Sequence, residues 1–104
     1  MKGFYTQDEF NNRQKTREIH IYGYKEWYIS KPDVVIYLDG KKVGSVPYKG
    51  HYMVEVDDNN HYFEFHWTMA IKGKCHCPIN KTFVGGLQLV TNRFLGSINV
   101  EFTM

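Results

Sequence analysis

Apolar and polar residues alternate along most of the chain, which is the pattern of half-buried β-strands. The first clear stretch carries Ile19, Ile21, Trp27 and Ile29 at the same parity, and Gly23 interrupts it. Because a glycine interrupts the apolar positions there, this spacing predicts a strand with a bulge or bend at Gly23. We therefore expect all four apolar residues to be buried.

The next stretch predicts a β-hairpin. Val34–Leu38 and Lys41–Val46 are two extended runs, and only Asp39 and Gly40 lie between them. Asp-Gly favours a type I′ turn, because both central residues then need a positive φ. A two-residue loop predicts three cross-strand pairs: Leu38 with Lys41, Tyr37 with Lys42 and Ile36 with Val43.

The third stretch predicts a second hairpin, with strands over 51–56 and 61–71 and a turn over 57–60. A four-residue turn places Val56 opposite His61 and His51 opposite His66. One face of this hairpin is then apolar, and it carries Tyr52, Val54, Val56, Phe63, Phe65, Trp67, Met69 and Ile71.

The last third of the chain predicts three more strands. Cys75–Cys77 forms a short strand that Pro78 ends, 82–90 forms a strand with a kink at Gly85, and 94–102 forms the last one. About eight short strands with turn residues between them are typical of an all-β, two-layer antiparallel β-sandwich. We expect one sandwich domain over 17–104.

Residues 1–16 are mostly polar, so we expect a flexible N-terminal arm there. Thr6-Gln7-Asp8-Glu9 has the spacing of a capping box, which favours one helical turn near Thr6–Phe10. No apolar run marks a secretory signal, so we expect a cytoplasmic protein.

Composition supports the β assignment. Val, Ile, Thr, Tyr, Phe and Trp supply 39 of the 104 residues, whereas Ala, Leu and Met supply nine. β-branched and aromatic side chains suit a pleated sheet, and the scarce types are those that favour helices. The composition excludes a helical bundle, a disordered chain and a coiled coil.

The net charge of +2 is small, and the lysines are scattered over predicted turns. A nucleic-acid-binding protein usually carries a basic stripe, and a membrane-anchored one a polybasic cluster. We therefore expect neither a nucleic-acid partner nor membrane binding.

Cys75 and Cys77 are separated by His76 alone, a spacing that strains a disulfide. Their parity places both thiols on the apolar face, where cysteine behaves as a small hydrophobic residue. A metal site built on the two cysteines and a distant histidine is one alternative, and a redox role of the thiols is the other.

The predicted pairing of His51 with His66, with Glu64 next to them, allows a metal site or a coupled titrating pair. The alternative is two half-exposed histidines with no special role. No serine lies in a nucleophile-elbow context, and Gly85-Gly86 lacks the lysine that a phosphate-binding loop requires. We expect no catalytic residues, no cofactor and no enzyme activity.

Five tyrosines fall on positions that we predict to face outward, and they form the candidate interaction surface. They are Tyr22, Tyr24, Tyr28, Tyr37 and Tyr62. Such side chains can cover the edge of a core, bind a protein partner or stack on sugar rings.

The stretch 34–67 resembles the core of PEGA-type β-sandwich domains. The resemblance rests on the alternating strand Val34–Leu38, on Asp39-Gly40 and Val43-Gly44, on Pro47, and on Asn60-His61 before another alternating strand. The chain is also similar to short bacterial β proteins that share the Asp-Gly hairpin. The resemblance implies a small non-enzymatic sandwich that serves as a surface or interaction module.

These observations together predict a non-catalytic protein-interaction or structural module. The expected partner is another protein or a second copy, which would form a homodimer through an edge strand. A carbohydrate-binding module that uses the surface tyrosines and a metal-binding domain are the alternatives.

Overall fold

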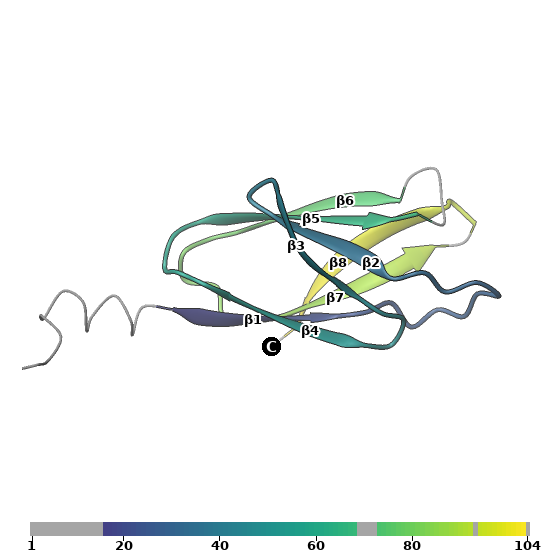
Figure 1. The fold of residues 1–104 in the computed structure, drawn as a ribbon, viewed down its shortest axis with the longest axis horizontal. Coiled ribbons are helices and arrows are strands. Elements are labelled where there is room, and N and C mark those ends of the chain that lie inside the picture. Colours follow the sequence, from purple (N-terminus) through teal and green to yellow (C-terminus); the bar gives the residue numbers. More distant parts are fainter. Residues whose placement is uncertain (1–15, 69–72, 93, 104) are drawn as a thin grey trace, which may run out of the picture.

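The computed structural model describes residues 16–68, 73–92 and 94–103, and within these ranges the protein is an all-β sandwich of two four-stranded sheets (Figure 1). This confirms the predicted fold class. The strands are β1 (Arg17–Tyr22), β2 (Val34–Leu38), β3 (Lys41–Val46), β4 (His51–Val56), β5 (His61–Trp67), β6 (Lys74–Ile79), β7 (Gly85–Asn92) and β8 (Ser97–Thr103).

Sheet A has the strand order β4-β1-β7-β8, and sheet B has the order β3-β2-β5-β6. All neighbouring strands are antiparallel except β1 and β7, which are parallel, with Ile19 opposite Gly85 and Ile21 opposite Leu87. The prediction of a fully antiparallel sandwich is therefore wrong at this one pair. The described residues contain no helix long and apolar enough to cross a membrane.

The core lies between the inner faces of the two sheets. Its buried members are Ile19, Ile21, Val54, Val56, Leu87, Leu89 and Ile98 from sheet A, Val34, Ile36, Val46, Phe63, Phe65, Trp67, Cys77 and Ile79 from sheet B, and Tyr24 from the β1–β2 connection. The alternate residues of these strands face outward, as a pleated sheet requires. Burial of the apolar face supplies the main stabilisation of the fold.

The β2–β3 hairpin has the predicted turn. Asp39 and Gly40 have φ values of 51° and 87°, the signs that a type I′ turn requires. The register shifts between Ile36 and Tyr37, so that Ile36 lies opposite Gly44 instead of Val43. The predicted pairs of Leu38 and Tyr37 are confirmed.

The predicted hairpin of β4 and β5 is wrong. β4 pairs with β1 in sheet A, with Val54 opposite Ile19, whereas β5 lies between β2 and β6 in sheet B. Period-two alternation shows which face of a strand is buried but does not identify its neighbour, since either pairing buries the same side chains. The turn over 57–60 crosses between the layers instead of joining two paired strands (Figure 1).

Gly23 does not continue the strand as a bulge. Its backbone N–H donates to the carbonyl of Gly50 at 2.9 Å, and a Cβ at this position would lie 2.0 Å from the carbonyl oxygen of Pro47. After this close contact the burial pattern changes parity, so Tyr24 is buried. Trp27 and Ile29, which we predicted to be buried, are exposed for the same reason.

Strand boundaries elsewhere differ by a few residues from the prediction. β6 continues through Pro78 to Ile79, because β6 is an edge strand and an edge residue can lack a ladder donor. The predicted burial of Met69 and Ile71 lies outside the described residues. The N-terminal arm, apart from Thr16, also lies outside them.

Candidate functional site

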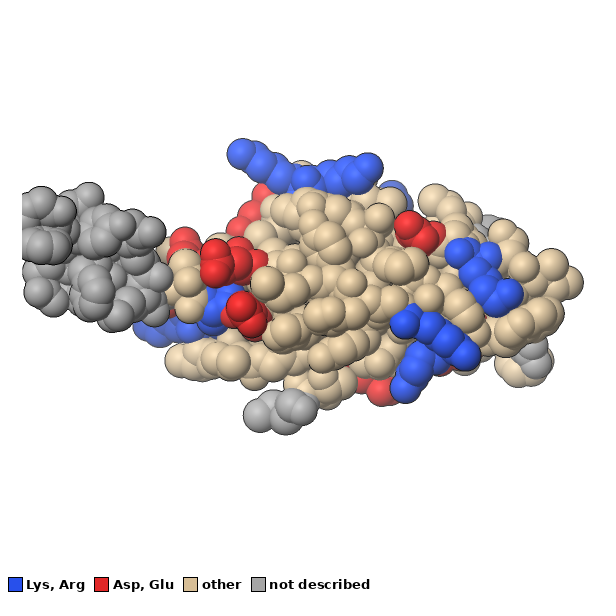
Figure 2. Space-filling view, turned by 60° about the horizontal axis from the view of Figure 1, so that its bottom comes forward, with Lys and Arg blue, Asp and Glu red and all other residues tan. Residues whose placement is uncertain are grey.

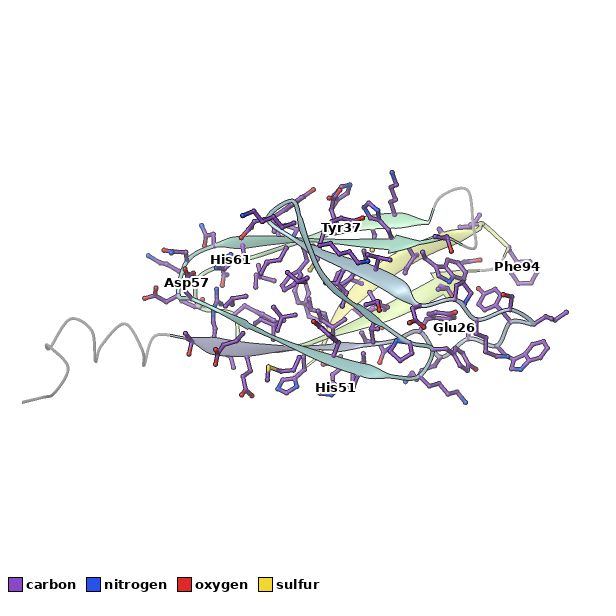
Figure 3. The ribbon with its side chains drawn as sticks, viewed as in Figure 1. Glu26, Tyr37, His51, Asp57, His61 and Phe94 are labelled. Atoms are coloured by element: carbon purple, nitrogen blue, oxygen red, sulfur yellow. The ribbon has the colours of Figure 1, made fainter. Side chains whose placement is uncertain are left out.

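The outer face of sheet B brings together four aromatic rings and one carboxylate. They come from three adjacent strands: Tyr37 from β2, Tyr62, Glu64 and His66 from β5, and His76 from β6. Glu64 lies directly between Tyr37 and His76 in the strand register. We call these five residues the aromatic face; Figure 3 labels Tyr37 on it.

Two ring pairs organise the aromatic face. The rings of Tyr37 and His66 have centroids 4.3 Å apart, and those of Tyr62 and His76 are stacked at 5.4 Å. The hydroxyl oxygen of Tyr62 lies 2.5 Å from Nδ1 of His76, and Oε2 of Glu64 lies 3.3 Å from the same nitrogen. The face therefore combines ring surfaces with groups that can donate and accept hydrogen bonds.

The structure separates the five predicted surface tyrosines. Tyr37 and Tyr62 share the aromatic face, whereas Tyr22 lies on the outer face of sheet A. Tyr28 packs partly against the core and donates to Oγ1 of Thr91.

The placement of Tyr24 on the surface is wrong. Its side chain is 0% exposed, and its hydroxyl donates to the carbonyl of Pro32 at 2.9 Å. Its ring contacts Tyr28, Tyr48 and Trp67. Burial is the main cause that raises the pKa of this phenol, because it disfavours the phenolate.

The predicted pairing of His51 with His66 is also wrong, because their strands belong to different sheets. His51 instead lies beside His20 of β1, and Nδ1 of His20 is 2.8 Å from Nε2 of His51. One imidazole donates to the other, and Tyr22 stacks on the His51 ring. A histidine pair exists, but the correct partner depends on the β1–β4 pairing.

The two thiols point toward the core, as their parity predicts. Cys77 is buried, and Cys75 packs against the core from a partly exposed position. Burial raises the pKa of Cys75 to about 12 and that of Cys77 to about 11. Both side chains therefore stay protonated at neutral pH, whereas metal binding and nucleophilic attack require the thiolate.

A histidine that we did not single out from the sequence, His61, lies between two carboxylates. Its Nδ1 is 2.6 Å from Oδ2 of Asp39, and its Nε2 is 2.6 Å from Oδ1 of Asp57 (Figure 3). A carboxylate only accepts hydrogen bonds, so the imidazolium form of His61, in which both ring nitrogens donate, satisfies both contacts. Burial by itself lowers the pKa of His61, but the bonds to Asp39 and Asp57 outweigh it, and the pKa is raised.

The end of the sandwich opposite His61 exposes four large apolar side chains. Trp27 is 62% and Ile29 is 89% exposed on the β1–β2 connection, and Phe94 is 90% and Leu95 is 69% exposed on the β7–β8 turn. We call these four residues the loop end. Figure 3 labels Phe94 and Glu26 at this end of the molecule.

A cleft of about 490 Å³ lies between Trp27 and Phe94. Glu26 and Thr91 line this cleft. Oε1 of Glu26 accepts hydrogen bonds from both the backbone N–H and the hydroxyl of Thr91, each at 2.8 Å. These bonds tie the β1–β2 connection to β7, so the apolar side chains of the two loops are held at the same end.

Nothing in the described ranges groups three His, Cys, Asp or Glu side chains in a way that could hold a metal ion. In the His61 cluster, the ring nitrogens are already bonded to the carboxylates. Within the described residues, both the aromatic face and the loop end expose large aromatic or apolar side chains that can contact a partner.

Comparison with known proteins assigns the chain to no family. No model of a known protein family matches the chain, and no curated protein sequence matches it. The resemblance of 34–67 to PEGA-type domains stays a prediction.

Proposed function

We propose that the protein is a non-catalytic interaction module that binds another protein through the aromatic face of sheet B. The observation that carries this proposal is the pair of ring contacts, Tyr37 with His66 and Tyr62 with His76, on one outer sheet surface. Tyrosine supplies a large contact area at a small cost in conformational entropy, and aromatic residues are enriched in protein interfaces.

The strand arrangement supports the same surface. β6 forms one edge of sheet B, so the backbone groups on its outer side border the aromatic face directly. An unpaired strand edge beside exposed rings offers a partner both hydrogen bonds and apolar contacts. The partner is a different protein or a second copy, which would form a homodimer along this edge.

The first experiment identifies the partner. A photo-crosslinking residue replaces His76 on the aromatic face, and a matched variant carries it at Met53 on the outer face of sheet A, where the side chain is also exposed. Mass spectrometry of adducts specific to position 76 should identify either a partner protein or the chain itself. Light scattering during size-exclusion chromatography measures the homodimer directly.

The second experiment tests the residues. Tyr62→Ser should weaken binding of the purified partner, or dimer formation, by at least about tenfold, because exposed tyrosines are frequent hot spots. Tyr22→Ser on the other sheet should have no effect. The proposal is wrong if the protein is monomeric at all concentrations and position 76 yields no adduct that position 53 lacks.

Carbohydrate binding is the second candidate. The exposed ring of Tyr62 has Glu64 and His76 next to it, which offers both stacking and hydrogen bonds to a sugar. A glycan array tests this candidate, and hits that Tyr62→Ser abolishes would favour it over a protein partner. An array without hits would remove it.

A further inference from the structure

We propose that the loop end docks onto the surface of an anionic lipid bilayer. This inference goes beyond the proposed function, because it concerns the opposite region of the molecule from the aromatic face and another class of partner. It revises the expectation of no membrane binding, which rested on the absence of a polybasic cluster in the linear sequence.

The apolar side chains of the loop end lie at the tips of two connections. Ile29 and Phe94 are nearly fully exposed, and Trp27 and Leu95 are more than half exposed. Single exposed apolar residues are ordinary on a protein surface, but four large ones on neighbouring loops are not. Projecting side chains of this kind can enter the boundary between lipid headgroups and acyl chains without any spanning element.

Basic side chains are held close to these tips. The ammonium of Lys31 lies 4.8 Å from the centroid of the Trp27 ring and 5.5 Å from that of Tyr48. Lys49 lies 5.4 Å from the Tyr48 ring, and the hydroxyl of Tyr48 donates to the carbonyl of Lys25. The ammonium groups of Lys31 and Lys49 therefore both lie near the ring of Tyr48.

In Figure 2 the end on the right is mostly uncharged, and both basic and acidic side chains border it. Glu26 is the acidic group in the cleft, and Thr91 holds one of its oxygens. Asp33 is near the buried phenol of Tyr24.

The loop end combines apolar side chains with nearby lysines, and an anionic bilayer combines an apolar interior with negatively charged headgroups. The two surfaces are therefore complementary. Trp prefers the headgroup level, and lysine stems can lie along apolar surface while their ammonium groups reach the phosphates. Each lysine near an anionic surface strengthens binding by about fivefold, an effect that salt screens. Neither the insertion of the apolar side chains nor the attraction of the lysines is strong alone. We therefore expect weak, reversible docking that needs both contributions.

The test uses the full chain and vesicles. We expect cosedimentation with vesicles of equimolar phosphatidylcholine and phosphatidylglycerol, weaker binding at high salt, and little binding to phosphatidylcholine alone. Trp67 is buried in the core, so a blue shift of tryptophan emission on binding should come from Trp27 and should vanish in Trp27→Phe.

Matched variants locate the surface. Ile29→Ser and Phe94→Ser should each lower vesicle affinity by at least about tenfold, whereas Val84→Ser, an exposed apolar position on the β6–β7 connection, should not. Lys31→Glu should lower the vesicle affinity by at least about fivefold, and Lys41→Glu at the start of β3 far less. Thermal unfolding of each variant verifies that it is folded.

Three results would overturn the proposal: no binding to the mixed vesicles, equal binding to phosphatidylcholine alone, or equal loss in Val84→Ser. Capture of a protein partner by the loop end, without vesicle binding, would also overturn it. Tyr62→Ser should leave vesicle affinity unchanged, so the lipid result and the test of the aromatic face remain independent.

Discussion

The Nδ1 atom of His61 lies 2.6 Å from Oδ2 of Asp39, and this contact joins the start of β5 to the turn between β2 and β3. The other oxygen of Asp39 accepts the backbone N–H of Tyr62 at 2.9 Å, and the other nitrogen of His61 reaches Asp57. One imidazolium therefore ties the β2–β3 turn to the connection between β4 and β5. The contact leads to a prediction about pH.

The protein should be most stable in weakly acidic solution. The pKa of His61 is raised above its ordinary value of 6.5, so its contribution is fully present below that value and is lost as pH rises through the folded pKa. The pKa of Asp57 is lowered from 3.8, chiefly by its bond to His61, so its contribution is lost as pH falls. Urea unfolding over a pH series should show the largest free energy of unfolding between pH 3.8 and pH 6.5, the ordinary pKa values of Asp57 and His61.

His61→Gln tests the origin of that maximum. The substitution should lower the free energy of unfolding by about 1–2 kcal/mol in weakly acidic solution, because it removes two charge-assisted hydrogen bonds. It should also flatten the decline toward alkaline pH. His51→Gln, on the outer face of sheet A, serves as the control, and a decline that persists in His61→Gln would contradict the assignment.

Gly23→Ala should destabilise the protein by about 2 kcal/mol or more, because its Cβ would overlap the carbonyl oxygen of Pro47, a backbone atom that cannot move alone. Gly40→Ala is the comparison: there is open space around Gly40, and only its φ of 87° opposes a side chain. We expect a smaller loss there, of about 1 kcal/mol. Chemical denaturation should rank the two variants in this order.

Tyr24 should behave as a core residue. Tyr24→Phe should lower the free energy of unfolding by about 1 kcal/mol, because the part-buried hydrogen bond to the carbonyl of Pro32 is lost, and Tyr24→Ala should lower it by about 3–5 kcal/mol. Tyr22→Phe, on an exposed outer face, should be nearly neutral. Equal effects of Tyr24→Phe and Tyr22→Phe on the unfolding midpoint would show that the phenol of Tyr24 is not buried.

The cysteines should resist modification in the folded state. With pKa values of about 12 and 11, Cys75 and Cys77 form little thiolate at neutral pH, and the burial of Cys77 and the partial burial of Cys75 restrict access of a reagent. Ellman's reagent should label both thiols quickly in denaturant and slowly without it. Rapid labelling of the native protein would show that one thiol is exposed and reactive.

Local chemistry allowed several features to be predicted correctly. The Asp39-Gly40 turn follows from two residues that tolerate positive φ, and the inward orientation of Cys75 and Cys77 follows from strand parity. The all-β class follows from composition and alternation together. Each of these depends on residues close in sequence, or on the simple rule that apolar faces are buried.

The candidate sites depended on contacts that local pattern does not contain. Alternation predicted that His51 faces outward, but its neighbour is His20, because β4 joins β1 instead of β5. In the same way, Trp27 and Phe94 line one cleft, at which Glu26 of the β1–β2 connection accepts hydrogen bonds from Thr91 of β7.

The sequence by itself therefore determined the β architecture, the type I′ turn and the inward orientation of both thiols. Only the tertiary structure decided that β1 and β7 are parallel, that Tyr24 is buried and that the loop end is exposed. The physical reason is that side-chain period selects a face but not a partner strand, and that a close backbone contact at Gly23 follows β1, after which Tyr24 is buried and Trp27 and Ile29 are exposed.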